Sequence, residues 1–163
     1  MRIFAILMSL MLALGACTSS KFQFYSGPEV TGILVYKGER KMYLMHGNQA
    51  LKVYDVGLGF APQGHKQREG DGRTPEGAYM IDRRNPNSQF HLSLGISYPN
   101  AEDRAYAARN GFSPGGDIFI HGRPWRNRKG GVDWTAGCIA VTNREMQEIY
   151  AMVKDDTPIW IYE

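Results

Sequence analysis

One histidine and one cysteine in the C-terminal half of the chain could form a nucleophilic pair. His121 ends a short run of β-forming residues, and Cys138 stands 17 positions later, between Gly137 and the apolar residues 139–141. In cysteine catalysis an imidazole takes the thiol proton and later protonates the leaving amine, while a third group orients the ring. Gly122 could be that group through its carbonyl. A helix start directly after this segment would also favour the thiolate form of Cys138.

The cysteine count bears on whether that thiol is free. The chain has two cysteines, and Cys17 follows an N-terminal segment with an early arginine, an apolar run and two small residues. This pattern predicts a signal peptide over residues 1–16. Its end is similar to a bacterial lipoprotein cleavage site, so we expect Cys17 to be lipidated, with plain secretion as the alternative. We expect a periplasmic protein tethered to the outer membrane through residues 17–27.

Cys138 then has no disulfide partner in an oxidising compartment. It is either a free reactive thiol or a buried cysteine that packs as a small hydrophobic residue.

Length and charge restrict the classes of function. A chain of 163 residues suits one folded domain, expected over residues 28–163, and the net charge of +3 comes with no arginine or lysine run of the nucleic-acid-binding type. Basic residues gather at 65–68 and at Arg123, Arg126, Arg128 and Lys129. They are either solvated loop residues or groups that attract a substrate with free carboxylates.

The elements that must position the pair are mostly strands. Alternating β-formers predict a three-stranded antiparallel meander over residues 32–36, 41–46 and 49–54, followed by strands at 78–82, 90–94, 117–120 and 158–162. The last strand is expected to be an edge or terminal strand. Asn100 can cap a helix over 101–109, and Thr142 with Glu145 forms a capping box for a second helix. The long segment 57–77 is expected to be ordered by its turns.

The other histidines have structural explanations. His46 belongs to a hairpin and His91 to a strand, whereas His65 lies in the long loop and could line a cleft. No cysteine or histidine pair has the short spacing of metal ligands, so we expect no metal. Gly57-Leu58-Gly59 lacks the third glycine of a dinucleotide loop, and we expect no cofactor.

Three stretches in the right order carry a resemblance to a known family. They are residues 69–79 (EGDGRTPEGAY), 118–122 (IFIHG) and 134–143 (WTAGCIAVTN). Together they resemble the YkuD-type L,D-transpeptidase catalytic domain, in which His-Gly precedes a Ser/Thr-His-Gly-Cys pattern. The resemblance implies a small, mostly β sandwich or barrel-like domain with one or two short helices.

The resemblance also implies roles. Cys138 would attack the bond between diaminopimelate and terminal D-alanine in a peptidoglycan tetrapeptide stem and form a thioester. His121 would be the general base and acid, oriented by the Gly122 carbonyl, and an amine acceptor would resolve the thioester. Carbapenems would acylate the same cysteine. The residues implied to stabilise the oxyanion or bind substrate are Gly137, Thr135, Ala136, Tyr98, Arg73 and Arg123.

Two positions depart from the family pattern. Ala136 stands where a second histidine is usual, and Ala140 stands where arginine or asparagine often follows the cysteine. These departures leave a hydrolase open as an alternative: a carboxypeptidase, a cross-link endopeptidase or a lipoprotein-releasing amidase. A tethered, non-catalytic peptidoglycan-binding protein is a second alternative.

Overall fold

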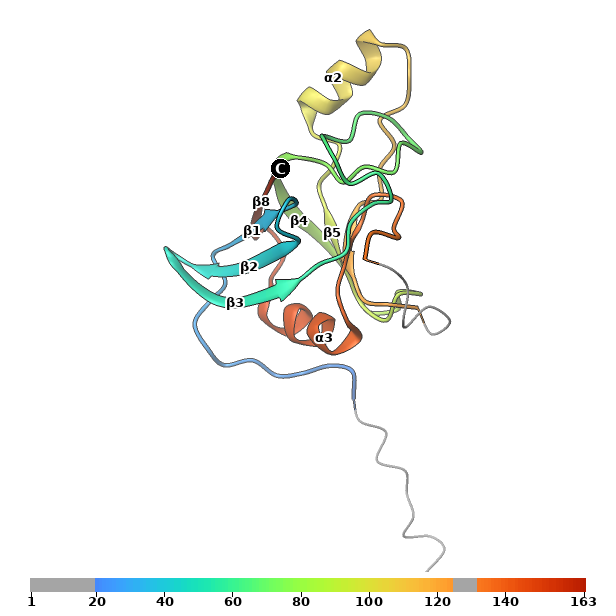
Figure 1. The fold of residues 1–163 in the computed structure, drawn as a ribbon. Helices are drawn as coiled ribbons and strands as arrows, with labels where there is room; N and C mark the ends of the chain where they lie inside the picture. Colours follow the sequence, from blue (N-terminus) through green and yellow to red (C-terminus); the bar gives the residue numbers. More distant parts are fainter. Residues whose placement is uncertain (1–19, 125–131) are drawn as a thin grey trace, which may run out of the picture.

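The computed structural model describes residues 20–124 and 132–163, which fold around one curled sheet (Figure 1). Eight strands follow one another across it in the order β3-β2-β1-β8-β4-β5-β6-β7. Their bounds are β1 Gly32–Tyr36, β2 Lys41–His46, β3 Gln49–Asp55, β4 Gly77–Asn85, β5 Ser93–Ile96, β6 Phe119–His121, β7 Ile139–Ala140 and β8 Pro158–Tyr162. With two short helices, this confirms the expected mostly β, barrel-like class.

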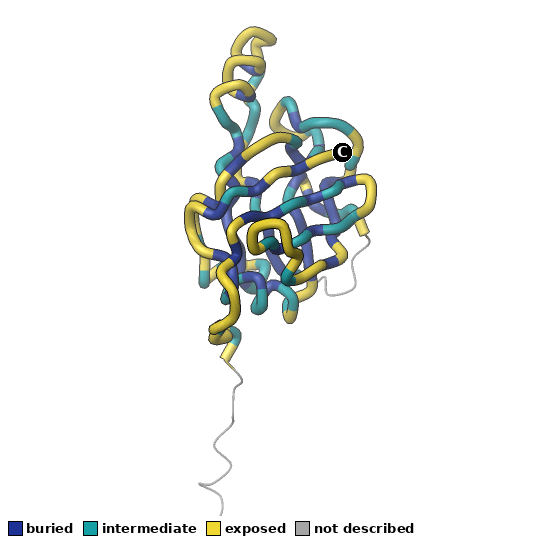
Figure 2. Tube along the Cα trace, turned by 90° about the vertical axis from the view of Figure 1, so that its left-hand side faces the viewer, coloured by how far each residue is buried: buried dark blue, intermediate teal, exposed yellow. Residues whose placement is uncertain are grey.

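The expected antiparallel meander forms β1, β2 and β3. Alternation buries Ile33 and Val35 on one face of β1, and Met42 and Leu44 of β2 are buried with them. Figure 2 shows the same alternation of buried and exposed residues along the strands. Burial of one apolar face fixes the register, because a shift by one residue would move every side chain to the opposite face.

The last strand corrects an expectation, since β8 lies inside the sheet and not at its edge. It pairs in parallel with β1 and antiparallel with β4. Its alternation was recognisable, with Ile159 and Ile161 buried and Trp160 and Tyr162 exposed. Alternation does not say which strands will flank a segment, and here the two neighbours come from distant parts of the chain.

The strands around the site differ from the predicted bounds. β4 continues to Asn85, and β5 begins at Ser93 rather than at residue 90. The prediction that His91 lies in a strand is wrong, because its φ of 77° is left-handed and belongs to a turn. β6 begins at Phe119 and includes His121, whereas Asp117, with φ 54°, precedes the strand.

Both predicted helices are confirmed. Helix α2 (Ala101–Arg109) is capped by Asn100 and stands apart from the sheet, mostly exposed (Figures 1 and 2). Helix α3 (Asn143–Met152) begins with the Thr142–Glu145 capping box. It packs against β5 and β6 with Met146 and Ile149 fully buried. Helix α3 is therefore attached to the strand that carries His121.

Lys21 and Phe22, in the described part of the expected tether, contact the domain. Lys21 Nζ donates to the carbonyls of Pro86 and His91, the latter at 3.3 Å. The ring centroids of Phe22 and Tyr150 lie 6.3 Å apart. The predicted signal peptide and Cys17 lie outside the described residues. Within the described residues, no helix is long and apolar enough to cross a membrane.

Candidate active site

The ring of His121 is held by its own neighbour. Its Nδ1 lies 2.6 Å from the Gly122 carbonyl oxygen. A carbonyl can only accept, so Nδ1 carries the proton and Nε2 of the neutral ring is left as the base. Burial lowers the pKa of His121; the bond to Gly122 acts in the opposite direction, and the Arg123 charge adds to the lowering. The imidazole is therefore neutral at rest and can accept a proton.

Cys138 is half-buried beside β6. Its thiol donates to the Asp117 carbonyl with an Sγ–O distance of 3.5 Å. Burial raises the pKa of the Cys138 thiol, although the Phe119 backbone N–H works against that rise. The expectation that a helix start favours the thiolate is wrong here, since β7 follows Cys138 and α3 is capped later by Thr142. The resting pair is thus a thiol and a neutral imidazole, and the proton must move when substrate is attacked.

The two residues line one cavity of about 520 Å³. The rest of its wall comes from β4, β5, β6, the turn between β4 and β5 and the segment just before β6, namely Asn85, Asn87, Ser88, Gln89, Phe90, Ser93, Asp117 and Phe119. Amides and hydroxyls on this wall can bind the polar backbone of a peptide. The size suits a few residues of an extended peptide.

Aromatic rings cover the imidazole. The Phe90 ring lies 4.4 Å from the His121 ring, and the Trp134 ring lies 5.7 Å from it, edge to face. The Arg123 guanidinium lies over the indole of Trp134 at 5.6 Å. These rings account for the burial of His121 and restrict its rotation.

Thr135 shapes the loop that carries the nucleophile. Its Oγ1 donates to the Cys138 carbonyl at 2.8 Å and accepts from the Gly137 N–H at 3.1 Å. Gly137 has φ 133°, and a Cβ there would lie 2.6 Å from the Arg73 carbonyl oxygen. The loop is therefore held by an internal hydroxyl bridge and by close contact with the segment 57–77. The Gly137 N–H, which was expected to stabilise an oxyanion, is engaged inside the loop by Thr135.

The long segment 57–77 is ordered, as its turn residues predicted, and it supports the loop that carries the nucleophile. The Phe60 N–H donates to the Thr135 carbonyl at 2.9 Å, and Gly57 pairs with Ala140 in an antiparallel bridge. A Cβ on Gly59 would lie 2.0 Å from the Gly72 carbonyl oxygen, so only glycine fits that crossing. Ala140 is buried in this contact, where a longer side chain would not fit without rearrangement.

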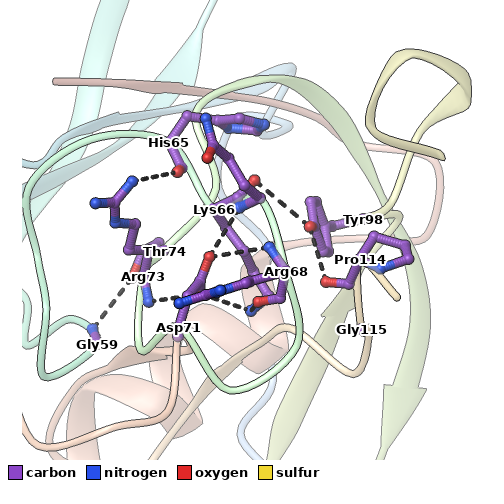
Figure 3. A network of polar contacts seen from close by, with 12 residues as sticks. Gly59, His65, Lys66, Arg68, Asp71, Arg73, Thr74, Tyr98, Pro114 and Gly115 are labelled. Carbon is purple, nitrogen blue, oxygen red and sulfur yellow. Dashed lines mark hydrogen bonds and ion pairs between the residues drawn. The ribbon is translucent and has the colours of Figure 1, made fainter. Parts of the chain in front are cut away.

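A buried ion pair stabilises the loop itself (Figure 3). Lys66, which is 3% exposed, donates to Asp71 at 3.0 Å. Burial of Asp71 would raise its carboxyl pKa, but the N–H groups of Gln67, Arg68 and Arg73, together with Lys66, lower it to about 2. These bonds satisfy both charges, as burial of an ion pair requires.

His65 ties the same loop to helix α2. Its Nδ1 accepts from the Glu76 N–H at 2.9 Å, and its Nε2 lies 3.0 Å from Asp103 Oδ1. With Nδ1 as acceptor, Nε2 carries the proton and donates to the carboxylate. His65 does line a surface hollow, with Glu76 and Asn100 among its neighbours. Both ring nitrogens are used in structural bonds.

Asn143, the first residue of α3, fixes the base. Its Oδ1 accepts from the Arg123 N–H at 2.6 Å. A Cβ on Gly122 would lie 2.5 Å from that same Oδ1 and 2.9 Å from the Phe90 carbonyl oxygen. Gly122 thus serves close packing as well as the His121 hydrogen bond. Through this bond, helix α3 contacts the segment that carries the histidine.

The predicted site residues separate into two groups. Cys138, His121 and Gly122 come together, and Thr135, Gly137 and the exposed Ala136 form the loop beside them. Tyr98 and Arg73 lie away from the cavity. The Tyr98 hydroxyl donates to the Pro114 carbonyl at 3.0 Å, and the Arg73 side chain lines a separate hollow with Arg40 and Glu163. Arg126, Arg128 and Lys129 lie outside the described residues.

Sequence reasoning missed much of the cavity wall and its supports, including Phe90, Ser93, Asp117 and Asn143. Ser93 faces His121 across the β5–β6 pairing, and Phe90 reaches the ring from a turn. The capping residue Thr142, next to Asn143, can be recognised in the sequence. The bond that Asn143 accepts from Arg123 cannot, because it depends on which strand the helix packs against. In the described part of the chain, no group of three or more histidine, cysteine and acidic side chains could hold a metal.

Comparison with known proteins agrees with this geometry. Residues 31–161 match YkuD, the L,D-transpeptidase catalytic domain. The chain is 32% identical over 128 residues to "Putative L,D-transpeptidase YafK" of Escherichia coli K12. The aligned region covers 74% of this chain and 46% of that protein.

Solved structures share the fold. The helical cell shape determining protein Pgp2 of Campylobacter jejuni, as its K307A mutant, has 26% identity and a TM-score of 0.65, covering 85% of this chain and 49% of that one. Bd1075 of Bdellovibrio bacteriovorus has 25% identity and a TM-score of 0.60, and the match covers 86% of this chain and 51% of Bd1075. The chain spans about half the length of these relatives. It belongs to the YkuD family of L,D-transpeptidase catalytic domains.

Proposed function

We propose that the chain is a cysteine acyltransferase that acts on peptidoglycan tetrapeptide stems. The observation that carries this proposal is the fixed tautomer of His121, whose Nδ1–H donates to the Gly122 carbonyl while the ring shares a cavity with the free thiol of Cys138. Membership in the L,D-transpeptidase family supplies the substrate class.

The chemistry follows from the resting protonation states. Nε2 of His121 takes the thiol proton as sulfur attacks the carbonyl before the terminal D-alanine. The oxyanion forms near the Cys138 N–H, and removal of one such donor costs about 3 kcal/mol in enzymes that use it. The imidazolium then gives its proton to the leaving D-alanine amine, which leaves a thioester on Cys138 and a neutral His121.

The acceptor that ends the reaction defines two candidate functions. An amine gives transpeptidation, whereas water gives hydrolysis. Ala136, which is exposed next to Gly137, supports the hydrolase as the second candidate. Its methyl group cannot hydrogen-bond to an acceptor amine or activate it. The likeness to a cell shape determining protein supports a role in remodelling the cell wall.

Product analysis tests the proposal. Purified protein is incubated with a disaccharide tetrapeptide, with and without a D-amino acid, and the products are separated by mass. Exchange of the terminal residue or a cross-linked dimer supports the transferase. Tripeptide and D-alanine as sole products would identify the hydrolase, and no reaction would contradict both.

We further propose export and attachment to the outer membrane through Cys17. The sequence pattern before Cys17 supports this proposal, and the proposed peptidoglycan substrate would be reached from the periplasm. Membrane fractionation of cells that carry the wild type or Cys17→Ala tests it: the variant should lose membrane association, and an unchanged distribution would contradict lipidation.

A further inference from the structure

Asp117 has an unusual position beside the nucleophile. Its φ of 54° is left-handed, a conformation that few residues other than glycine, asparagine and aspartate adopt. This backbone places the Asp117 carbonyl 3.5 Å from Cys138 Sγ, and Asp117 is one of the residues that line the cavity. The carboxylate therefore belongs to a residue whose backbone contacts the attacking thiol.

The cavity wall carries one formal charge at neutral pH. Its ten lining residues comprise amides, serines, phenylalanines, the thiol, the neutral His121 and Asp117. Burial keeps the imidazole neutral by lowering the pKa of His121. The charge on this described wall is negative, so it favours a cationic group on the bound substrate.

One oxygen of the carboxylate is available to a ligand. Asp117 Oδ1 accepts from Arg83 Nη2 at 3.0 Å, and no described residue bonds to Oδ2. The side chain is 90% exposed. Arg83 is itself positioned by the Phe119 ring, 4.6 Å from its guanidinium carbon. Arg83 thus pairs with one carboxylate oxygen and leaves the other open to solvent.

We propose that Asp117 is a specificity residue that binds the ammonium group on the side chain of the residue acylated onto Cys138. This inference rests on the proposed function and names the residue that would recognise the free second amine of the diaminopimelate expected at this position of the stem. That amine lies at the end of the side chain of the acylated residue.

Two donor stems test it, one with the free side-chain amine and one with that amine acetylated. The readout is kcat/KM for D-alanine release, which does not depend on the acceptor. Wild type should prefer the free amine by about fivefold, the upper range for a solvent-exposed ion pair. Asp117→Asn keeps a residue that tolerates the left-handed backbone, and it should bring the ratio of the two kcat/KM values close to one.

Arg83→Gln separates ligand binding from a structural ion pair. If Asp117 binds the ammonium group, loss of Arg83 retains or increases the preference. If the pair is only structural, both variants lower D-alanine release from the two stems equally, and the inference is overturned. It is also overturned if Asp117→Asn keeps the wild-type ratio. Failure of wild type to release D-alanine from either stem would instead contradict the proposed function.

Discussion

Oδ1 of Asn143 accepts a hydrogen bond of 2.6 Å from the backbone N–H of Arg123. This bond joins the first residue of α3 to the segment that holds the His121 ring through Gly122. The position of the catalytic imidazole therefore depends on a helix that begins after the nucleophile.

Asn143→Ala should lower kcat by about tenfold, with little change in KM, because the Gly122 carbonyl loses its fixed position. Asn143→Asp retains an acceptor at the same place and suits a helix N-terminus, so it should recover most of the activity. Steady-state release of D-alanine measures both. Equal loss in the two variants, or a change in KM alone, would show that Asn143 does not position the base.

The thiol of Cys138 should react slowly with iodoacetamide at neutral pH. Its pKa is raised by burial, and that of His121 is lowered, so no thiolate–imidazolium pair is stabilised at rest. The rate of alkylation should continue to rise as the pH passes the range of an ordinary cysteine. The same series on Cys138→Ala corrects for Cys17. A rate that reaches a plateau near pH 7 would indicate a preformed ion pair and contradict this account.

Gly137→Ala should disrupt the nucleophile loop. The added Cβ would lie 2.6 Å from the Arg73 carbonyl oxygen at a φ of 133°. Strain of this kind costs about 1–3 kcal/mol, and the loop must move to relieve it. Gly116→Ala is the matched control, since its Cβ would meet only Pro99 at 4.0 Å. The free energy of unfolding, measured with denaturant, and the rate of D-alanine release should both fall for Gly137→Ala. Both should remain near wild type for Gly116→Ala.

Asp71 should stabilise the fold above about pH 4. Its pKa falls from 3.8 to about 2 on folding, a shift equivalent to about 2 kcal/mol. A carboxyl group whose pKa is lowered contributes fully above its unfolded pKa, and this contribution is lost as the pH falls from about 4 to about 2. Asp71→Asn should remove this pH dependence and leave buried Lys66 unpaired.

The exposed pair Lys41–Asp55 provides the control for that experiment. Asp55→Asn should change the free energy of unfolding by less than about 1 kcal/mol. If the two variants have equal unfolding curves between pH 2 and 7, the Lys66–Asp71 pair does not support the loop.

Local pattern predicted much of the fold. The meander, both capped helices and the ordered turns of segment 57–77 depend on alternation, capping residues and turn glycines, all of which are visible over a few positions. The central place of β8 and the turn at His91 were not predictable in this way. They result from pairing between distant strands and from packing of the β4–β5 turn against the imidazole.

The site followed the same division. Cys138, His121 and Gly122 were recognised from residue type and motif, and the structure holds His121 and Gly122 in the expected hydrogen bond. Asn143, Phe90 and Asp117 reach the site through tertiary contacts that no short motif encodes. The protonation state also required the structure, because burial rather than a helix terminus determines the pKa of Cys138.

The central claim is that Cys138 forms a thioester with the peptide stem. The most direct measurement is intact-mass spectrometry of the protein mixed with excess tetrapeptide muropeptide and quenched with acid. The account predicts a mass gain equal to the donor minus D-alanine, mapped to Cys138 and absent from Cys138→Ala. D-alanine release by Cys138→Ala at the wild-type rate, or an adduct on another residue, would contradict it.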